Sequence, residues 1–314
     1  MGIVRTALRR SLRSVRHVTP VRPRAARGAV AAVYARVEAD FGLLAAPVAL
    51  HSPSPTALSA CWTLLRETLI ASGAESRAAK EAVAAAVSRQ NDCPYCVTVH
   101  AATLDRLSDR PPVEVAPPLA EVGAELLGVV VAFHYLNRMV NVFLEDSPLP
   151  AGAPAFAEGL LGRFMVVGAR RAHPPGVTAR LLPAAPLPPD LAWAAATPAV
   201  GDALGRVAAA FEAGGRRTLS DPARELVTAR IAAWDGTPPG LDRGWVREAV
   251  RELPTDEQPG AALALLVAFA SYQVDDAAVT AVGGGDAALV ELAGWAAFSA
   301  ARRMAALAAQ TTGV

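Results

Sequence analysis

The sequence has little that would suit a secreted or nucleic-acid-binding protein. Its three cysteines, Cys61, Cys93 and Cys96, are too few for a disulfide framework. The N-terminus has no clean apolar core followed by a cleavage site, so no secretory signal is visible. The net charge of +1 provides no global attraction for nucleic acid. These absences predict a cytoplasmic protein with no nucleic-acid partner.

Strand patterns are also scarce. Aromatic residues make up 5% of the chain, and no run alternates apolar and polar residues convincingly. Alanine, which favours helices, is abundant, and the apolar spacing is mostly helical. We therefore expect an all-α fold, with helices at 28–41, 55–72, 75–90, 94–107, 118–145, 153–171, 198–213, 221–233, 241–252, 259–281 and 286–310.

Uncharged runs long enough to cross a membrane are almost absent. Residues 258–274 form an uncharged stretch at the lower limit of a spanning length, and Asp275 and Asp276 follow it directly. No basic flank marks a cytoplasmic side. A buried core helix fits this stretch better, so we expect no transmembrane segment.

The first 27 residues have eight arginines and no acid. Val4, Leu8, Leu12 and Val15 would share one face of a helix. This pattern fits a membrane-surface or targeting helix, and it equally fits a packing arm or a tail. The rest of the chain divides into a helical domain at 28–172, a Pro-rich linker at 173–195 and a second helical domain at 196–314.

The two helical domains resemble each other. Residues 79–83 (AKEAV) match residues 223–227 (ARELV), and at the same spacing 91–96 (NDCPYC) match 235–240 (DGTPPG). The second copy has lost both cysteines, and Gly244 stands where His100 would be. The sequence therefore predicts a tandem repeat whose second copy is degenerate. Chance similarity between Ala-rich helices is the alternative.

The segment from Glu81 to His100 contains the residues most suited to chemistry. Pro94 suits a first helical turn, which places Cys93 at a helix N-terminus and Cys96 in the first turn. The helix dipole there favours thiolate over thiol, so we expect a lowered thiol pKa. His100 lies one turn after Cys96 and can exchange its proton. Glu81, on the preceding helix, can orient the imidazole.

A zinc site is a less favoured alternative. Cys93, Cys96 and His100 would need a fourth ligand, such as Cys61, Glu81 or His134, and no second Cys-x-x-Cys is present. We assign no metal. Cys61 lies among apolar residues and is interpreted as a buried structural thiol.

The combined pattern resembles the alkylhydroperoxidase D (AhpD)-like branch of the carboxymuconolactone decarboxylase superfamily. That branch has Glu, eleven residues, Cys-x-x-Cys, three residues and His, and Glu81, Cys93, Cys96 and His100 have this spacing. The resemblance covers about residues 45–145 directly. It implies an AhpD-like helical fold and a homo-oligomer. It also implies Cys96 as the peroxide-attacking thiolate, Cys93 as the resolving thiol and a Glu81–His100 proton relay. Some members carry a histidine between the cysteines, where this chain has Tyr95.

A polar stripe marks the apolar segment 133–141. His134, Asn137, Arg138 and Asn141 recur at one helical face. Buried polar groups need partners, so the stripe either faces the active site or a subunit contact, or holds helices together. Tyr95, His134, Asn137 and Arg138 are therefore possible relay or pocket residues.

The resemblance implies a thiol-dependent peroxidase or dithiol oxidoreductase. Its substrate would be a small hydroperoxide or disulfide, its reductant a thioredoxin-like or lipoyl partner, and no organic cofactor would be required. A redox-sensing or partner-binding helical protein is the alternative.

Overall fold

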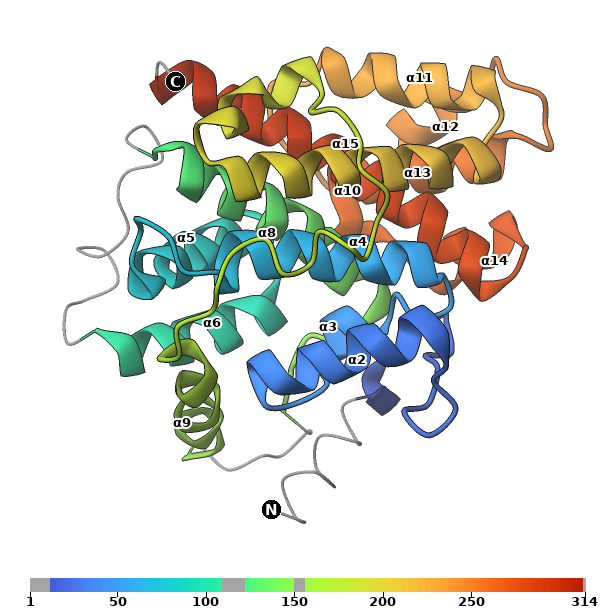
Figure 1. The fold of residues 1–314 in the computed structure, drawn as a ribbon. Coiled ribbons are helices and arrows are strands. Elements are labelled where there is room, and N and C mark those ends of the chain that lie inside the picture. The colour runs from blue at the N-terminus through green and yellow to red at the C-terminus, as the bar shows by residue number, and fades with distance from the viewer. Residues whose placement is uncertain (1–11, 109–121, 150–155, 313–314) are drawn as a thin grey trace.

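The computed structural model describes residues 12–108, 122–149 and 156–312 (Figure 1). An isolated bridge joins Val15 to Leu144, and the described residues contain no strand, so the all-α prediction is confirmed. The α-helices are α2 (Gly28–Phe41), α3 (Ala46–Ala49), α4 (Pro55–Leu65), α5 (Arg77–Gln90), α6 (Pro94–Leu107), α8 (Ala124–Phe143), α9 (Phe156–Ala169), α10 (Pro198–Thr218), α11 (Asp221–Ala232), α12 (Gly244–Val250), α13 (Gln258–Ala270), α14 (Asp276–Val282) and α15 (Asp286–Thr312).

Serine caps and early prolines set several helix starts. Ser54, Ser76 and Ser220 each accept a hydrogen bond from a backbone N–H in the first turn of the helix that follows. Pro55 and Pro94 occupy first helical positions, where the missing N–H has no cost. These local signals explain why the predicted starts at 55 and 94 agree with the structure.

Helix α8 is the centre of the fold. It packs against α5 on one side and against α15, from the far end of the chain, on another. One apolar cluster runs through both predicted domains. By length and composition α8 could cross a membrane, and so could α14 and α15 if that bent pair formed one span. However, 94% of the apolar stretch of α8 is buried inside the protein. That burial is expected of a core helix.

The described part of the N-terminal arm packs on the body. Arg16 donates from its backbone to Phe143 O and from its side chain to Asn141 O. Tyr34 donates its hydroxyl to Val21 O. Leu12 and Val15 of the predicted amphipathic face lie against the core, whereas Val4 and Leu8 are outside the described residues. These contacts favour the packing arm for residues 12–27.

Three predicted segments differ in kind from the structure, and α10 runs five residues beyond its predicted end at 213. The expected helix at 55–72 ends as α4 at Leu65 and continues as a π-helical turn, Arg66–Ile70. The expected helix at 259–281 is broken into α13, a 3-10 turn and α14, because Asp275 caps a new helix by accepting from Ala278 N. The Pro-rich segment contains an unexpected 3-10 helix, Pro189–Ala196.

The order of elements is parallel in the two predicted domains. Helices α4, α5, α6 and α8 are followed, after the Pro-rich segment, by α10, α11, α12 and α13. The capping residues Ser76 and Ser220 are 144 positions apart, as are Asp92 (φ 47°) and Gly236 (φ 95°), which both adopt left-handed backbone. These features accord with a tandem repeat, which stays a prediction.

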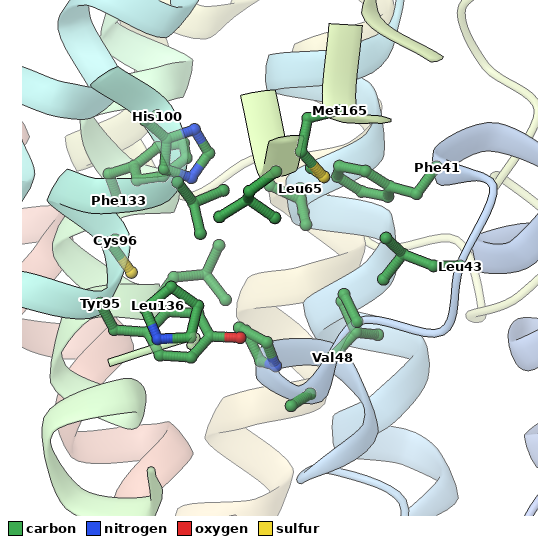
Figure 2. A pocket seen from close by; sticks show the side chains of 16 residues that line it. Phe41, Leu43, Val48, Leu65, Tyr95, Cys96, His100, Phe133, Leu136 and Met165 are labelled. Carbon is green, nitrogen blue, oxygen red and sulfur yellow. The ribbon is translucent and has the colours of Figure 1, made fainter. Parts of the chain in front are cut away.

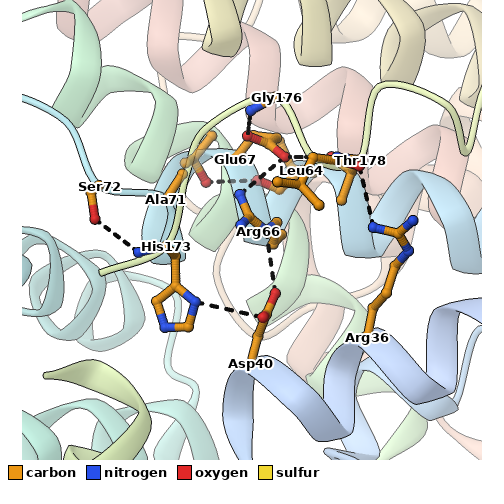
Figure 3. Close-up of polar contacts among 12 residues, drawn as sticks. Arg36, Asp40, Leu64, Arg66, Glu67, Ala71, Ser72, His173, Gly176 and Thr178 are labelled. Atoms are coloured by element: carbon orange, nitrogen blue, oxygen red, sulfur yellow. Dashed lines mark hydrogen bonds and ion pairs between the residues drawn. The ribbon is translucent and has the colours of Figure 1, made fainter. Parts of the chain in front are cut away.

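A buried ionic network ties the Pro-rich segment to the first helices (Figure 3). Arg66 contacts Asp40 on α2 at 3.2 Å and Glu67 at 3.3 Å. Glu67 also accepts from the backbone N–H groups of Gly176 and Thr178, at 2.7 and 3.1 Å. The π-helical turn thus presents a buried acid and base to two other segments, and we assign this network a structural role.

Candidate active site

The Cys-x-x-Cys motif lies at a helical hairpin. Helix α5 ends at Gln90, Asn91 and Asp92 make the turn, and α6 begins at Pro94. Cys93 is the residue before that helix, and Cys96 lies in its first turn, as the sequence predicted. Both thiols are free and buried.

Glu81 and His100 meet across this hairpin. His100 Nδ1 lies 2.6 Å from Glu81 Oε2, and both side chains are buried. Arg77, one turn before Glu81, contacts the other carboxylate oxygen at 2.7 Å. Burial acts to raise the pKa of Glu81, but the charges and hydrogen bonds of Arg77 and His100 outweigh it and lower that pKa. The carboxylate is therefore ionised at neutral pH and fixes the ring of His100.

The thiol of Cys96 is harder to ionise than the sequence predicted. The hydrogen bond that it shares with Cys93, together with burial, raises the pKa of Cys96 well above its ordinary value. Asn137 lowers that pKa through a side-chain hydrogen bond, without reversing the shift. The expectation of a lowered thiol pKa is therefore wrong for Cys96. The contact with the second thiol and the burial of Cys96 outweigh the effect of the helix dipole.

An apolar pocket of about 100 Å³ opens onto Cys96 and His100 (Figure 2). Figure 2 shows both side chains on one wall, with Met165 and Phe41 across the space. No hydrogen bond joins His100 to Cys96 within the described part of the chain. A peroxide oxygen or a water molecule between the two side chains could bridge the imidazole and the thiol. The other lining residues are Leu43, Ala45, Ala46, Pro47, Val48, Leu65, Tyr95, Val99, Phe133, Leu136, Pro148 and Leu161.

The structure separates the residues of the polar stripe. Tyr95 lines the apolar pocket, where burial raises its pKa, so it is a neutral phenol. Asn137 reaches Cys96. His134 and Arg138 do not line that pocket and instead contact Asn91, at 3.1 and 3.2 Å. Burial, followed by the charge of Arg138, lowers the pKa of His134, so this imidazole is neutral.

Metal ligands do not gather at this site. Within residues 12–108, 122–149 and 156–312, no three His, Cys, Asp or Glu side chains form a group that could hold a metal ion. Cys61 and His134 are thus not brought to the thiol pair as zinc ligands. Cys61 is fully buried, and that burial raises its thiol pKa.

Comparison with known proteins identifies the family. The chain is 37% identical, over 328 aligned positions, to a protein named alkyl hydroperoxide reductase Rv2159c from Mycobacterium tuberculosis, and the alignment covers 93% of this chain and 94% of that protein. The chain belongs to the AhpD-like alkyl hydroperoxide reductase family. No family model and no solved structure matches it.

Two polar residues of the candidate site were not predicted from the sequence. Arg77 holds Glu81, and its only signal was the i, i+4 spacing of an acid and a base on one helix. Asn91, in the turn between α5 and α6, donates to Asn137 Oδ1 at 3.0 Å and accepts from Arg138. Its contacts join residues more than 40 positions apart, which local patterns do not reveal.

Proposed function

We propose that this protein reduces organic hydroperoxides with the Cys93–Cys96 thiol pair. The observation that carries the proposal is the position of Cys96 and His100 on one wall of an apolar pocket, with His100 held by Glu81. The name of the Mycobacterium tuberculosis relative supports peroxide reduction in general. The apolar lining favours a substrate with an alkyl or aryl group over hydrogen peroxide.

The cycle begins when the Cys96 thiolate attacks the outer peroxide oxygen. The O–O bond breaks, Cys96 becomes a sulfenic acid, and the alkoxide leaves as an alcohol after taking a proton. Cys93 then attacks the sulfenic sulfur, which forms the Cys93–Cys96 disulfide and releases water. A dithiol partner of thioredoxin-like or lipoyl type reduces the disulfide and is itself oxidised.

His100 handles the proton in this proposal. Because the pKa of Cys96 is raised, the thiol has to lose its proton as the peroxide binds. His100, oriented by the ionised Glu81, accepts that proton and returns it to the leaving alkoxide. Asn137 stabilises the thiolate with its hydrogen bond.

The test is oxidation of the reduced protein by one equivalent of cumene hydroperoxide, followed by mass spectrometry. We expect loss of two hydrogens in the peptide that contains Cys93 and Cys96, and turnover when a dithiol is supplied. Cys96→Ser should abolish both, whereas Cys61→Ser, the same change at the thiol outside the pocket, should retain them. Normal turnover by Cys96→Ser would refute the proposal.

Substrate preference is tested with neighbouring leucines of α9. Leu161 lines the pocket, whereas Leu160 is 60% exposed and does not. Leu161→Asp should raise the KM for cumene hydroperoxide about tenfold or more and change the rate with hydrogen peroxide little. Leu160→Asp should change neither. Equal effects of the two variants on both peroxides would argue against the apolar pocket as the substrate site.

A further inference from the structure

A second cavity, of about 80 Å³, lies where the first half of the chain meets the second. The turn that precedes the thiol pair contributes Gln90, Asn91 and Asp92, and α8 contributes Arg138. It shares no lining residue with the apolar pocket at Cys96. The second half supplies Trp234, Gly236, Pro238, Phe269, Ser271, Tyr272 and Met304.

Arg138 is a buried cation in the wall of this cavity. Its side chain is 5% exposed, and no carboxylate lies within ion-pair distance among the described residues. Nε donates to Ala268 O at 2.9 Å, and Nη1 donates to His134 O at 2.7 Å and Asn91 Oδ1 at 3.2 Å. Nη1 also lies 3.3 Å from His134 Nδ1. Because all these partners are neutral, no anion among the described residues compensates the buried charge of Arg138.

The third guanidinium nitrogen is left for a ligand. Nη2 of Arg138 makes no hydrogen bond with any residue that the structure describes. It is also not a fully buried atom without a partner, so part of its surface is accessible. It is therefore open to the cavity. Ser271 Oγ accepts from Asn141 Nδ2 at 3.1 Å and keeps its own O–H to donate. Two donors, one of them charged, thus face the same space.

The other lining residues indicate which chemical group an anionic ligand of this cavity would contain. Trp234, Phe269 and Tyr272 are aromatic, and the Arg138 guanidinium carbon lies 5.8 Å from the centre of the Trp234 ring. Asp92 is the one acidic residue of the lining, and it is exposed. We infer that this cavity binds a small monocarboxylate with a flat apolar group, whose carboxylate pairs with Arg138 and Ser271. Phosphate, which is strongly hydrated and carries no apolar part, fits these walls less well.

The site lies close to the thiols through a short chain of contacts. Asn91 accepts from Arg138 and donates to Asn137 Oδ1, and Asn137 is close enough to Cys96 to lower its pKa. The inference does not depend on peroxidase activity, because its test measures binding alone.

The experiment is calorimetric titration of the full-length reduced protein with benzoate, and with neutral benzamide as the matched ligand. We expect benzoate to bind and benzamide to bind at least tenfold more weakly. Arg138→Gln should weaken benzoate at least tenfold, whereas Arg138→Lys, which keeps the charge, should lose less.

A second variant keeps the test valid if Arg138→Gln does not fold. Asp92→Asn removes the acid from the cavity lining, and asparagine tolerates the left-handed backbone at this position. It should bind benzoate about threefold more tightly, because a repulsive charge is gone. Equal binding of benzoate and benzamide, unchanged binding by a folded Arg138→Gln, or equal binding of inorganic phosphate would overturn the inference.

Discussion

His100 Nδ1 lies 2.6 Å from Glu81 Oε2, while Arg77 holds the other oxygen of the same carboxylate at 2.7 Å. The carboxylate therefore has a cation on one side and the imidazole on the other. This arrangement fixes the ring of His100, so that its second nitrogen, Nε2, is the one available for proton exchange. Arg77 also pairs with the carboxylate of Glu81, so the proton relay that we propose would involve three side chains instead of two.

Glu81→Gln should slow disulfide formation by cumene hydroperoxide about a hundredfold, within the range of general acid–base catalysis. The amide keeps the size of the side chain but loses the charge that orients and supports the imidazole. Stopped-flow measurement of thiol oxidation provides the rate. Asp202→Asn is the control, because Asp202 pairs with Arg206 at 2.8 Å on the exposed side of α10. Similar rates for both variants would exclude Glu81 from the relay.

Arg77→Gln should change the pH dependence of oxidation. Burial raises the pKa of Glu81, and Arg77 is the strongest of the groups that lower it. Without Arg77 the carboxyl takes up its proton at a higher pH, and the proposed relay requires its ionised form. The acidic limb of the oxidation rate, measured from about pH 5 to pH 8, should therefore move to higher pH, with little change on the alkaline side. An unmoved limb would show that Arg77 acts through packing alone.

Cys93→Ala should make Cys96 more reactive toward iodoacetamide at neutral pH. The hydrogen bond with Cys93 is the largest cause of the raised pKa of Cys96. Removing it lowers that pKa, and the thiolate fraction rises roughly tenfold for each unit of the fall. The rate of Cys96 alkylation, followed by peptide mass spectrometry against pH, measures this. Cys61→Ala should leave the rate unchanged. Slower alkylation in Cys93→Ala would contradict the assigned cause.

Much of the fold could be predicted because local signals dominate it. Pro94 sets the start of α6, and the helical spacing from Glu81 to His100 follows once the hairpin turn is placed. The broken helix after α13 could not be predicted from apolar spacing, since an aspartate cap at Asp275 decides it. Composition likewise reveals no π-helical turn at Arg66–Ile70, because tertiary contacts of Arg66 and Glu67 define it.

The candidate site shows the same division. The pairing of Glu81 with His100 could be predicted from spacing, because two adjacent helices position both residues. The pKa of Cys96 could not, since it depends on burial and on contacts with Cys93 and Asn137 in three dimensions. The polar stripe of α8 could be found by its period, but its division between Cys96 and the second cavity required the structure.

Glu67→Gln should destabilise the fold without touching the apolar pocket. Glu67 is 3% exposed and accepts hydrogen bonds from Arg66, Gly176 and Thr178. The neutral amide of glutamine removes one of the two acids that pair with Arg66 and leaves only Asp40. It also replaces one acceptor oxygen by an N–H donor. Breaking a buried ion pair typically costs about 3 kcal/mol of the free energy of unfolding.

Urea unfolding of the full chain measures the loss for Glu67→Gln, and Glu38→Gln is the matched control, because Glu38 is exposed on α2. That control should change the free energy of unfolding by about 0.5 kcal/mol or less. Because Glu67 does not line the apolar pocket, the oxidation rate of the folded Glu67→Gln protein should stay within about twofold of the parent. Equal stability of the two variants would show that the π-helical turn does not depend on this network, and that apolar packing of Leu69 and Ile70 holds it instead.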